Sequence, residues 1–170
     1  MPAPSMDTGV GSVQLYMKVG SGGSLTKESH TTSWKDKGYT DIQGFSLGAN
    51  ASWNFSSGQS AGGAASISDI SVSRNVMSST VLLFMGCAKE KYTDLLEVIC
   101  VDTTGKEILF AVRLKGEVRL TAVSLSGSAG STMSEQTSWT GKVLEIEHTK
   151  SSKKEHFDWS NVEQKGDELK

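Results

Sequence analysis

The sequence predicts a mainly β fold, an antiparallel β-barrel with one short α-helix. Two observations carry this prediction. Short segments with alternating apolar and polar residues recur along the chain, and only one segment has apolar residues at helical spacing. A barrel is expected because closing a sheet removes its exposed strand edges. The length of 170 residues fits one domain.

The first strand is predicted at residues 13–19, where apolar and polar residues alternate. Residues 20–37 are rich in Gly, Ser, Thr and Lys, which indicates a long surface excursion that contains an isolated Trp34. A second strand is predicted at residues 40–48. Its small residues suggest that one face lies close to another surface.

Residues 50–65 are rich in Gly, Ser and Ala and predict a loop. This loop also carries two large aromatic residues, Trp53 and Phe55, without an apolar strand around them. They either contact a partner or fold back on the core of their own domain, and aromatic enrichment at interfaces favours the partner.

The rest of the chain predicts one helix and several further strands. A short strand is marked by Ile67, Ile70 and Val72, and its phase breaks near Asp69. The helix is predicted from Met77 to Ala88, with Ser78 or Ser79 at its start. Later strands are predicted at residues 95–101, 108–114, 118–125 and 143–148, with turns at residues 102–106 and 115–117.

Composition excludes several classes of function. The net charge of −2 gives no general attraction to nucleic acid or to anionic lipid, so neither partner is expected. The longest apolar run, residues 81–85, is too short to span a membrane. The first eleven residues do not predict a cleaved signal peptide. Cys87 and Cys100 both lie among apolar residues, which predicts buried free thiols.

The sequence gives no convincing catalytic or metal-binding set, so we expect no enzyme, no metal and no cofactor. None of the three histidines has a second His or Cys at a zinc-type spacing. Ser24 or Ser46 could form a triad with His30 and Asp41, but chance supplies such combinations. The Gly and Ser clusters lack the Lys that ends a phosphate-binding loop.

The order of these features resembles the Hcp family, the tube-forming proteins of bacterial type VI secretion systems. The resemblance covers residues 13–148. It rests on these segments, in order: Met17-Lys18-Val19-Gly20; the strand from Tyr39 to Gly48; the Gly/Ser/Ala loop; Asp69 to Arg74; the helix with Leu83, Met85 and Cys87; and the strands Leu95 to Ile99, Glu107 to Leu114 and Val123 to Gly127. Residues 1–12 are then a flexible N-terminus, 13–150 an Hcp-like β-barrel domain and 151–170 a charged C-terminal tail.

The resemblance implies a structural subunit that forms hexameric rings, which stack into a tube inside a contractile sheath. The tube would be expelled with a spike protein of the VgrG type and would carry effector cargo in its lumen. The protein would be cytoplasmic before firing and secreted without a signal peptide. The ring-stacking loop would consist of Trp53, Phe55, Gly58, Gly62 and Gly63. If Phe45 and Leu47 face the core, Gly44 and Ser46 would face the lumen.

Two other classes of function remain open on the sequence. A β-sandwich recognition module, for example a carbohydrate-binding one, would use Trp34 and Trp53 on loops to stack on its ligand. A small hydrolase would need an intact constellation around His30 or His148.

Overall fold

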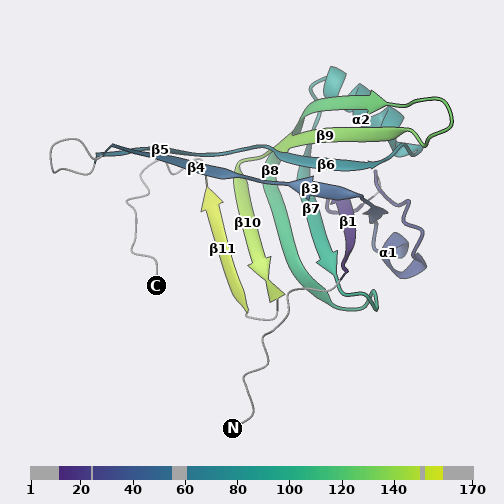
Figure 1. The fold of residues 1–170 in the computed structure, drawn as a ribbon, viewed down its shortest axis with the longest axis horizontal. Helices are drawn as coiled ribbons and strands as arrows, with labels where there is room; N and C mark the ends of the chain where they lie inside the picture. The colour runs from purple at the N-terminus through teal and green to yellow at the C-terminus, as the bar shows by residue number, and fades with distance from the viewer. Residues whose placement is uncertain (1–11, 24, 55–60, 150–151, 159–170) are drawn as a thin grey trace, which may run out of the picture.

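The computed structural model describes residues 12–23, 25–54, 61–149 and 152–158. The side chains of residues 51–65 and 156–158 are outside this description. A bent antiparallel sheet forms the body, and a β-hairpin projects from it (Figure 1). The elements are β1 (Gln14–Val19), α1 (Thr32–Asp36), β2 (Thr40–Asp41), β3 (Gly44–Ser46), β4 (Ala49–Asn54), β5 (Ala61–Ile67), β6 (Ile70–Asn75), α2 (Ser79–Ala88), β7 (Tyr92–Val101), β8 (Ile108–Ser126), β9 (Ser134–Thr140), β10 (Val143–His148) and β11 (Lys153–Asp158).

The main sheet has nine strands, and its path runs β2-β1-β7-β8-β9-β6-β3. Strand β10 pairs with β8 and β11, and every pairing is antiparallel. Strands β4 and β5 form a separate two-stranded sheet. The predicted antiparallel β class is therefore confirmed.

The sequence predicted a closed or nearly closed barrel, and the strand pairing of the described residues does not close the sheet. The path ends at β2 and β3, which are separated only by Ile42 and Gln43. The Ile42 amide donates to the Leu15 carbonyl (3.1 Å), and the Gln43 amide donates to the Ser73 carbonyl (2.8 Å). This one segment therefore bonds to strands at both ends of the path and brings those ends close together, although β2 and β3 do not pair with each other.

Strand β8 replaces two predicted strands and the predicted turn at residues 115–117. Gly116 and Glu117 have φ angles of 70° and 47°, and together they oppose only Asp94 on β7. This is a β-bulge, which bends a strand without reversing it. Before the bend β8 pairs with β10, and after it β8 pairs with β9.

Apart from the β4–β5 hairpin, two strands of the described residues were not predicted. β9 has no run of apolar residues, yet Glu135, Thr137 and Trp139 alternate with more exposed positions. β11 lies in the segment predicted as a charged tail, where it pairs with β10. Both strands form because a neighbouring strand offers its backbone groups, which composition alone does not reveal.

The described residues contain two helices where one was predicted. α2 confirms the predicted helix. α1 falls in residues 20–37, which lie on the surface as predicted but fold against the sheet, because Trp34 is only 3% exposed. Its ring stacks on Tyr16 with centroids 5.3 Å apart, and its indole N–H donates to the Gly105 carbonyl (2.9 Å).

The main core lies on the inner face of the bent sheet, and a smaller cluster lies between the sheet and the residue 25–41 segment. Residues directly opposite one another on neighbouring strands share a face of the sheet. Two such rows build the main core: Met17, Val98, Val112 and Ile146, and then Val19, Leu96, Leu114 and Leu144. Within the described ranges, no helix is long and apolar enough to cross a membrane.

Candidate functional site

The β4–β5 hairpin occupies most of the predicted loop at residues 50–65, so the prediction of a loop is wrong for its described part. Its pairing runs from Ala49 opposite Ile67 to Asn54 opposite Ala61. Figure 1 shows the hairpin extending away from the main sheet. No charged residue occurs between positions 42 and 68. The hairpin is therefore a projecting, uncharged element.

The predicted stacking residues divide between the described and undescribed parts of the chain. Trp53 lies in β4 opposite Gly62, and Gly63 follows in β5. Phe55 and Gly58 lie outside the described residues. The role of all five residues in ring stacking stays a prediction.

Gly44 and Ser46 belong to a polar, uncharged sheet face. Phe45 and Leu47 pack against the core cluster, as predicted, which places Gly44 and Ser46 on the opposite face. The register extends this face across four strands in two rows: Gly44, Ser73, Gln136 and Ser124, and then Ser46, Ser71, Ser138 and Ala122. A shallow hollow of about 230 Å³ lies over it. The two rows contain no charged side chain.

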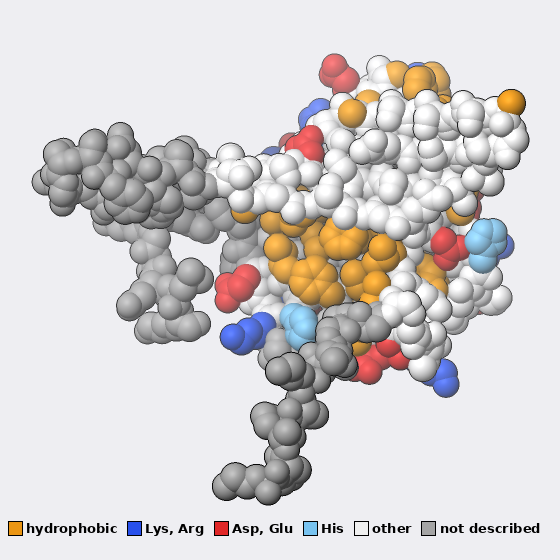
Figure 2. Space-filling model, in the orientation of Figure 1, with side chains coloured by type: hydrophobic (Ala, Val, Ile, Leu, Met, Phe, Trp, Pro, Cys, Tyr) orange, Lys and Arg blue, Asp and Glu red, His pale blue; other side chains and the backbone are white. Residues whose placement is uncertain are grey.

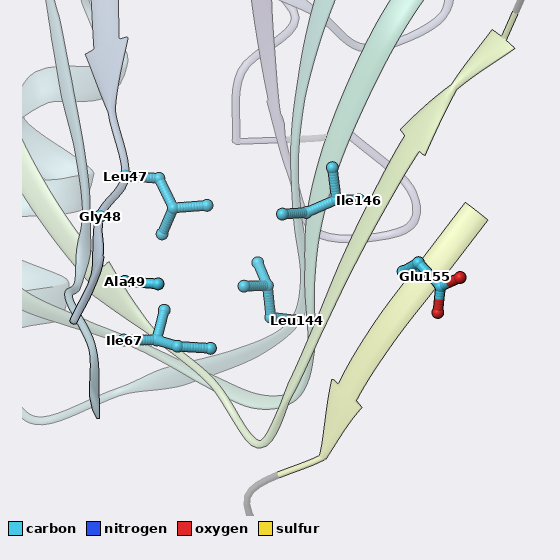
Figure 3. Close-up of a pocket in the computed structure, with 7 residues that line it drawn as sticks. All are labelled: Leu47, Gly48, Ala49, Ile67, Leu144, Ile146 and Glu155. Atoms are coloured by element: carbon cyan, nitrogen blue, oxygen red, sulfur yellow. The ribbon is translucent and has the colours of Figure 1, made fainter. Parts of the chain in front are cut away.

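An apolar hollow of about 300 Å³ opens beside the base of the hairpin. Figure 2 shows the hydrophobic side chains that gather there, over β8 and β10. In Figure 3, Leu47 and Ile67 on one side face Leu144 and Ile146 on the other, and Glu155 stands on β11. Among the described residues that line the hollow, Glu155 has the one polar side chain.

A network of charged side chains covers the outer face of β7, β8, β10 and β11. Arg113 donates to Glu97 (2.5 Å), to Glu145 (2.9 Å) and to Glu147 (2.5 Å). Burial lowers the pKa of Arg113, but these hydrogen bonds outweigh it and raise the pKa overall. The arginine therefore stays charged and ties the strands together.

Glu145 lies at the centre of that network. It also accepts from Lys115 (3.0 Å) and lies 3.1 Å from the Lys154 ammonium. Burial raises the pKa of Glu145, but the hydrogen bonds from Lys115, Lys154 and Arg113 prevail and hold the pKa at about 2. Neighbouring Glu97 accepts a hydrogen bond from Tyr39, whose pKa is raised by burial and by that bond.

A second charged cluster joins the sheet to the start of α2. Arg74 is 1% exposed, and its guanidinium donates to Glu135 (2.7 Å) and to Ser79 (2.9 Å). Glu28 accepts from the Ser79 amide (2.9 Å) at the helix N-terminus. Burial raises the pKa of Glu28, but hydrogen bonds from Ser78 and Ser79 and the charge of Arg74 lower it overall. The cluster fixes where α2 begins.

The described residues that were considered for catalysis are not brought together in a site. His30 is 87% exposed at its side chain, and its Nε2 lies 4.0 Å from Asp41 Oδ2. The Asp41 carboxylate instead accepts from Ser29 Oγ (2.8 Å) and from the His30 amide (2.8 Å). Ser24 lies outside the described residues, and Ser46 lies on the polar face. In the described part of the chain, no group of three His, Cys, Asp or Glu side chains is placed to hold a metal.

The cysteines and Trp34 correct two further predictions. Cys87 and Cys100 are free thiols, as predicted, but they are half-buried and not fully buried. Burial raises the pKa of the Cys100 thiol. Trp34 is enclosed between Tyr16 and Tyr39, so it cannot stack on a carbohydrate. The recognition-module alternative loses one of its two aromatic residues.

A protein-family model described as "Type VI secretion system effector, Hcp" matches residues 16–150. This match covers most of the chain. The chain belongs to the Hcp family. The family confirms the predicted function as a subunit of the type VI secretion tube.

Solved structures of Hcp proteins share the fold. Hcp1 from Salmonella typhimurium is 14% identical with a TM-score of 0.68, and the match covers 88% of this chain and 97% of that one. A type six secretion system protein is 18% identical with a TM-score of 0.69, covering 85% and 100%. Hcp3 from Pseudomonas aeruginosa is 14% identical with a TM-score of 0.59, covering 87% and 99%. Among curated proteins, no sequence matches.

Sequence reasoning missed two features of this Hcp chain. The polar face extends far beyond Gly44 and Ser46. The alternation of Ser and Gln with buried residues in β9 was the sequence pattern that could have indicated this face. The apolar residues of α2 are mostly exposed, although their helical spacing predicted the helix correctly. Both features lie on the outside of the subunit, where a self-assembling protein has its contacts.

Proposed function

We propose that this Hcp chain forms hexameric rings that stack into the inner tube of a type VI secretion system. The tube lies inside a contractile sheath, is expelled with a spike protein of the VgrG type and carries effectors in its lumen. The role is structural, without catalysis. The protein is cytoplasmic before firing and is then secreted. The projecting β4–β5 hairpin is the observation that supports assembly most directly.

The hairpin supports stacking because it contributes no strand pairing to the main sheet of its own domain. Strands β4 and β5 pair only with each other. An isolated two-stranded hairpin is marginally stable in water, so a chain that carries one gains from a partner that covers it. Its lack of charge removes the cost of burying ions at such a contact. We assign Trp53, Phe55, Gly58, Gly62 and Gly63 to this contact.

The polar face supports a lumen lined by Gly44 and Ser46. Its two rows carry small or uncharged polar side chains from β3, β6, β8 and β9. Such a surface stays hydrated and attracts neither positive nor negative cargo strongly. Cargo of varied charge is then able to occupy the same tube.

Deleting residues 51–62 tests the role of the hairpin. We expect rings of the purified variant to remain while stacks disappear in negative-stain images, because only the projecting element is removed. A matched control shortens the turn at Ser128–Ser131, which is exposed at the β8–β9 connection. Stacks that persist without residues 51–62 would contradict the assignment, and a lower melting temperature would show that the hairpin instead supports the fold.

A further inference from the structure

Helix α2 presents an apolar face to solvent. Val81, Leu82, Phe84 and Met85 are 67%, 58%, 47% and 45% exposed. Tyr92, at the start of β7, is 66% exposed, and a hollow of about 180 Å³ between α2 and the sheet is lined in part by Leu82 and Tyr92. These five residues are called the α2 face below. An exposed apolar patch of this kind marks a contact surface.

The α2 face is held rigidly by its own subunit. Leu83 is the one large apolar residue of α2 that is buried, and it anchors the helix in the core. At the helix N-terminus, Glu28 accepts from the Ser79 amide and hydroxyl, and Arg74 donates to the same hydroxyl (2.9 Å). The exposed side chains therefore project from a fixed element, which lowers the entropy lost on binding.

A stack of identical rings needs two different surfaces on each subunit. Head-to-tail contacts are heterologous, so a donor surface on one copy meets a different acceptor surface on the next. The hairpin is the donor in the proposed function. In Figure 1 the hairpin projects to the left, whereas α2 lies at the upper right of the body, so a subunit does not cover its α2 face with its own hairpin.

The chemistry of the two elements matches. Residues 42–68, which include the hairpin, and residues 75–88, which include α2, contain no charged residue. Contact between them therefore buries apolar surface without desolvating an ion. The hollow of Figure 3 is the rival acceptor, and because it lies beside the base of the hairpin, the second test below compares it with the α2 face directly.

We infer that the α2 face receives the β4–β5 hairpin of a second copy of this chain. This inference rests on the proposed function, because it supplies the acceptor for the hairpin in the stack. It assigns to α2 a contact that the fold of the single subunit does not explain.

The first test makes the α2 face polar with the double substitution Val81→Ser and Phe84→Ser. Because both side chains are exposed, the fold should be unaffected, and a melting curve checks this. We expect rings to persist while the fraction of rings found in stacks falls at least about tenfold. Val13→Ser is the matched control, since Val13 is an exposed valine outside the α2 face.

The second test identifies the occupant by a disulfide between copies. In a background with Cys87→Ser and Cys100→Ser, one copy carries Asn54→Cys in the hairpin and a differently tagged copy carries Val81→Cys. We expect the mixture to form a cross-linked pair that contains both tags. The comparison mixture replaces Val81→Cys with Ile146→Cys, beside the hollow of Figure 3, and should form none.

Each contrary outcome has a distinct meaning. Unchanged stacks in the polar variant, or a cross-link to position 146 in place of 81, would overturn the inference and leave the proposed function standing. Rings that fall apart into monomers would assign α2 to contacts within a ring and would also overturn it. If the unaltered chain forms no stacked rings, the proposed function fails together with the inference.

Discussion

At the scale of single residues, Arg74 is the charged residue whose buried environment bears most on the stability of the fold. Arg74 is buried and paired with Glu135. Within the described ranges, Arg74 Nη1 has no hydrogen-bond partner, and Glu28 Oε2 lies 3.8 Å from that nitrogen. Removing one member of a buried ion pair leaves the other uncompensated, whereas replacing both with apolar residues is often neutral.

Glu135→Gln should therefore lower the free energy of unfolding by about 3 to 5 kcal/mol. The double variant Arg74→Met, Glu135→Leu should be more stable than Glu135→Gln alone. Urea unfolding followed by circular dichroism measures both. A double variant less stable than the single one would show that this pair stabilises the fold beyond the cost of burying its charges.

Two glycines hold the residue 20–43 segment against itself. A Cβ on Gly38 would lie 2.7 Å from Gly23 Cα, and Gly38 has a φ of 88°. The contact lets Thr26 Oγ1 donate to the Gly38 carbonyl (2.9 Å) while it accepts from the Val19 amide (2.9 Å). Close backbone approach here positions Trp34 over the sheet.

Gly38→Ala should destabilise the domain by more than about 1 kcal/mol, because the new methyl meets backbone and the φ angle disfavours it. Gly22→Ala is the matched control, since no atom lies within 4 Å of its added Cβ. Thermal melting compares the two variants. Equal melting temperatures would mean that the segment shifts without cost.

At the scale of elements, the network around Arg113 holds four strands together through charge. Hydrogen bonds from its basic neighbours outweigh the effect of burial and hold the pKa of Glu145 at about 2, well below that of a free glutamate side chain. A carboxyl group whose pKa falls on folding stabilises the protein above its unfolded pKa, and that contribution is lost as the pH falls towards the folded pKa.

The melting temperature should thus decline as the pH drops from about 4.5 to about 2. Glu145→Gln should be less stable than the unaltered chain at pH 7 and should show a shallower decline through that window. Differential scanning calorimetry from pH 2 to pH 7 provides the comparison. Parallel curves for the two proteins would exclude Glu145 as a source of the pH dependence.

The sequence predicted strands well where large apolar residues occupy the buried positions. It predicted them poorly where a strand consists mainly of small or polar residues. β1, β7 and β10 have alternating or continuous apolar residues, and all three were found. β9 and the β4–β5 hairpin have Ser, Gly, Ala and Gln, so their backbone pairing left no hydrophobic signal. Gly116 indicated a turn, but a bulge uses the same backbone conformation.

At the scale of the whole molecule, the order of weak features was more informative than any single motif. Met17 to Gly20, the strand with Phe45 and the α2 segment predicted the Hcp family, which the family match confirms. The open path of the sheet was not predictable, because it depends on Ile42 and Gln43 bonding to different strands. The exposure of α2 was not predictable either, since helical spacing does not say whether an apolar face meets a core or a partner.

The assembly we propose gives separate roles to three surfaces of the subunit. The polar face lines the lumen, the hairpin projects to the next ring, and the α2 face receives a hairpin in turn. The subunit is then an element of an open stack, in which heterologous contacts repeat without closing.

Cryo-electron microscopy of the purified chain tests this account most directly. We predict class averages of sixfold rings with a central channel, and side views in which rings stack in register. In a reconstruction, Gly44 and Ser46 should line the channel. Particles the size of one subunit at high concentration, or rings with these two residues on the outer surface, would contradict it.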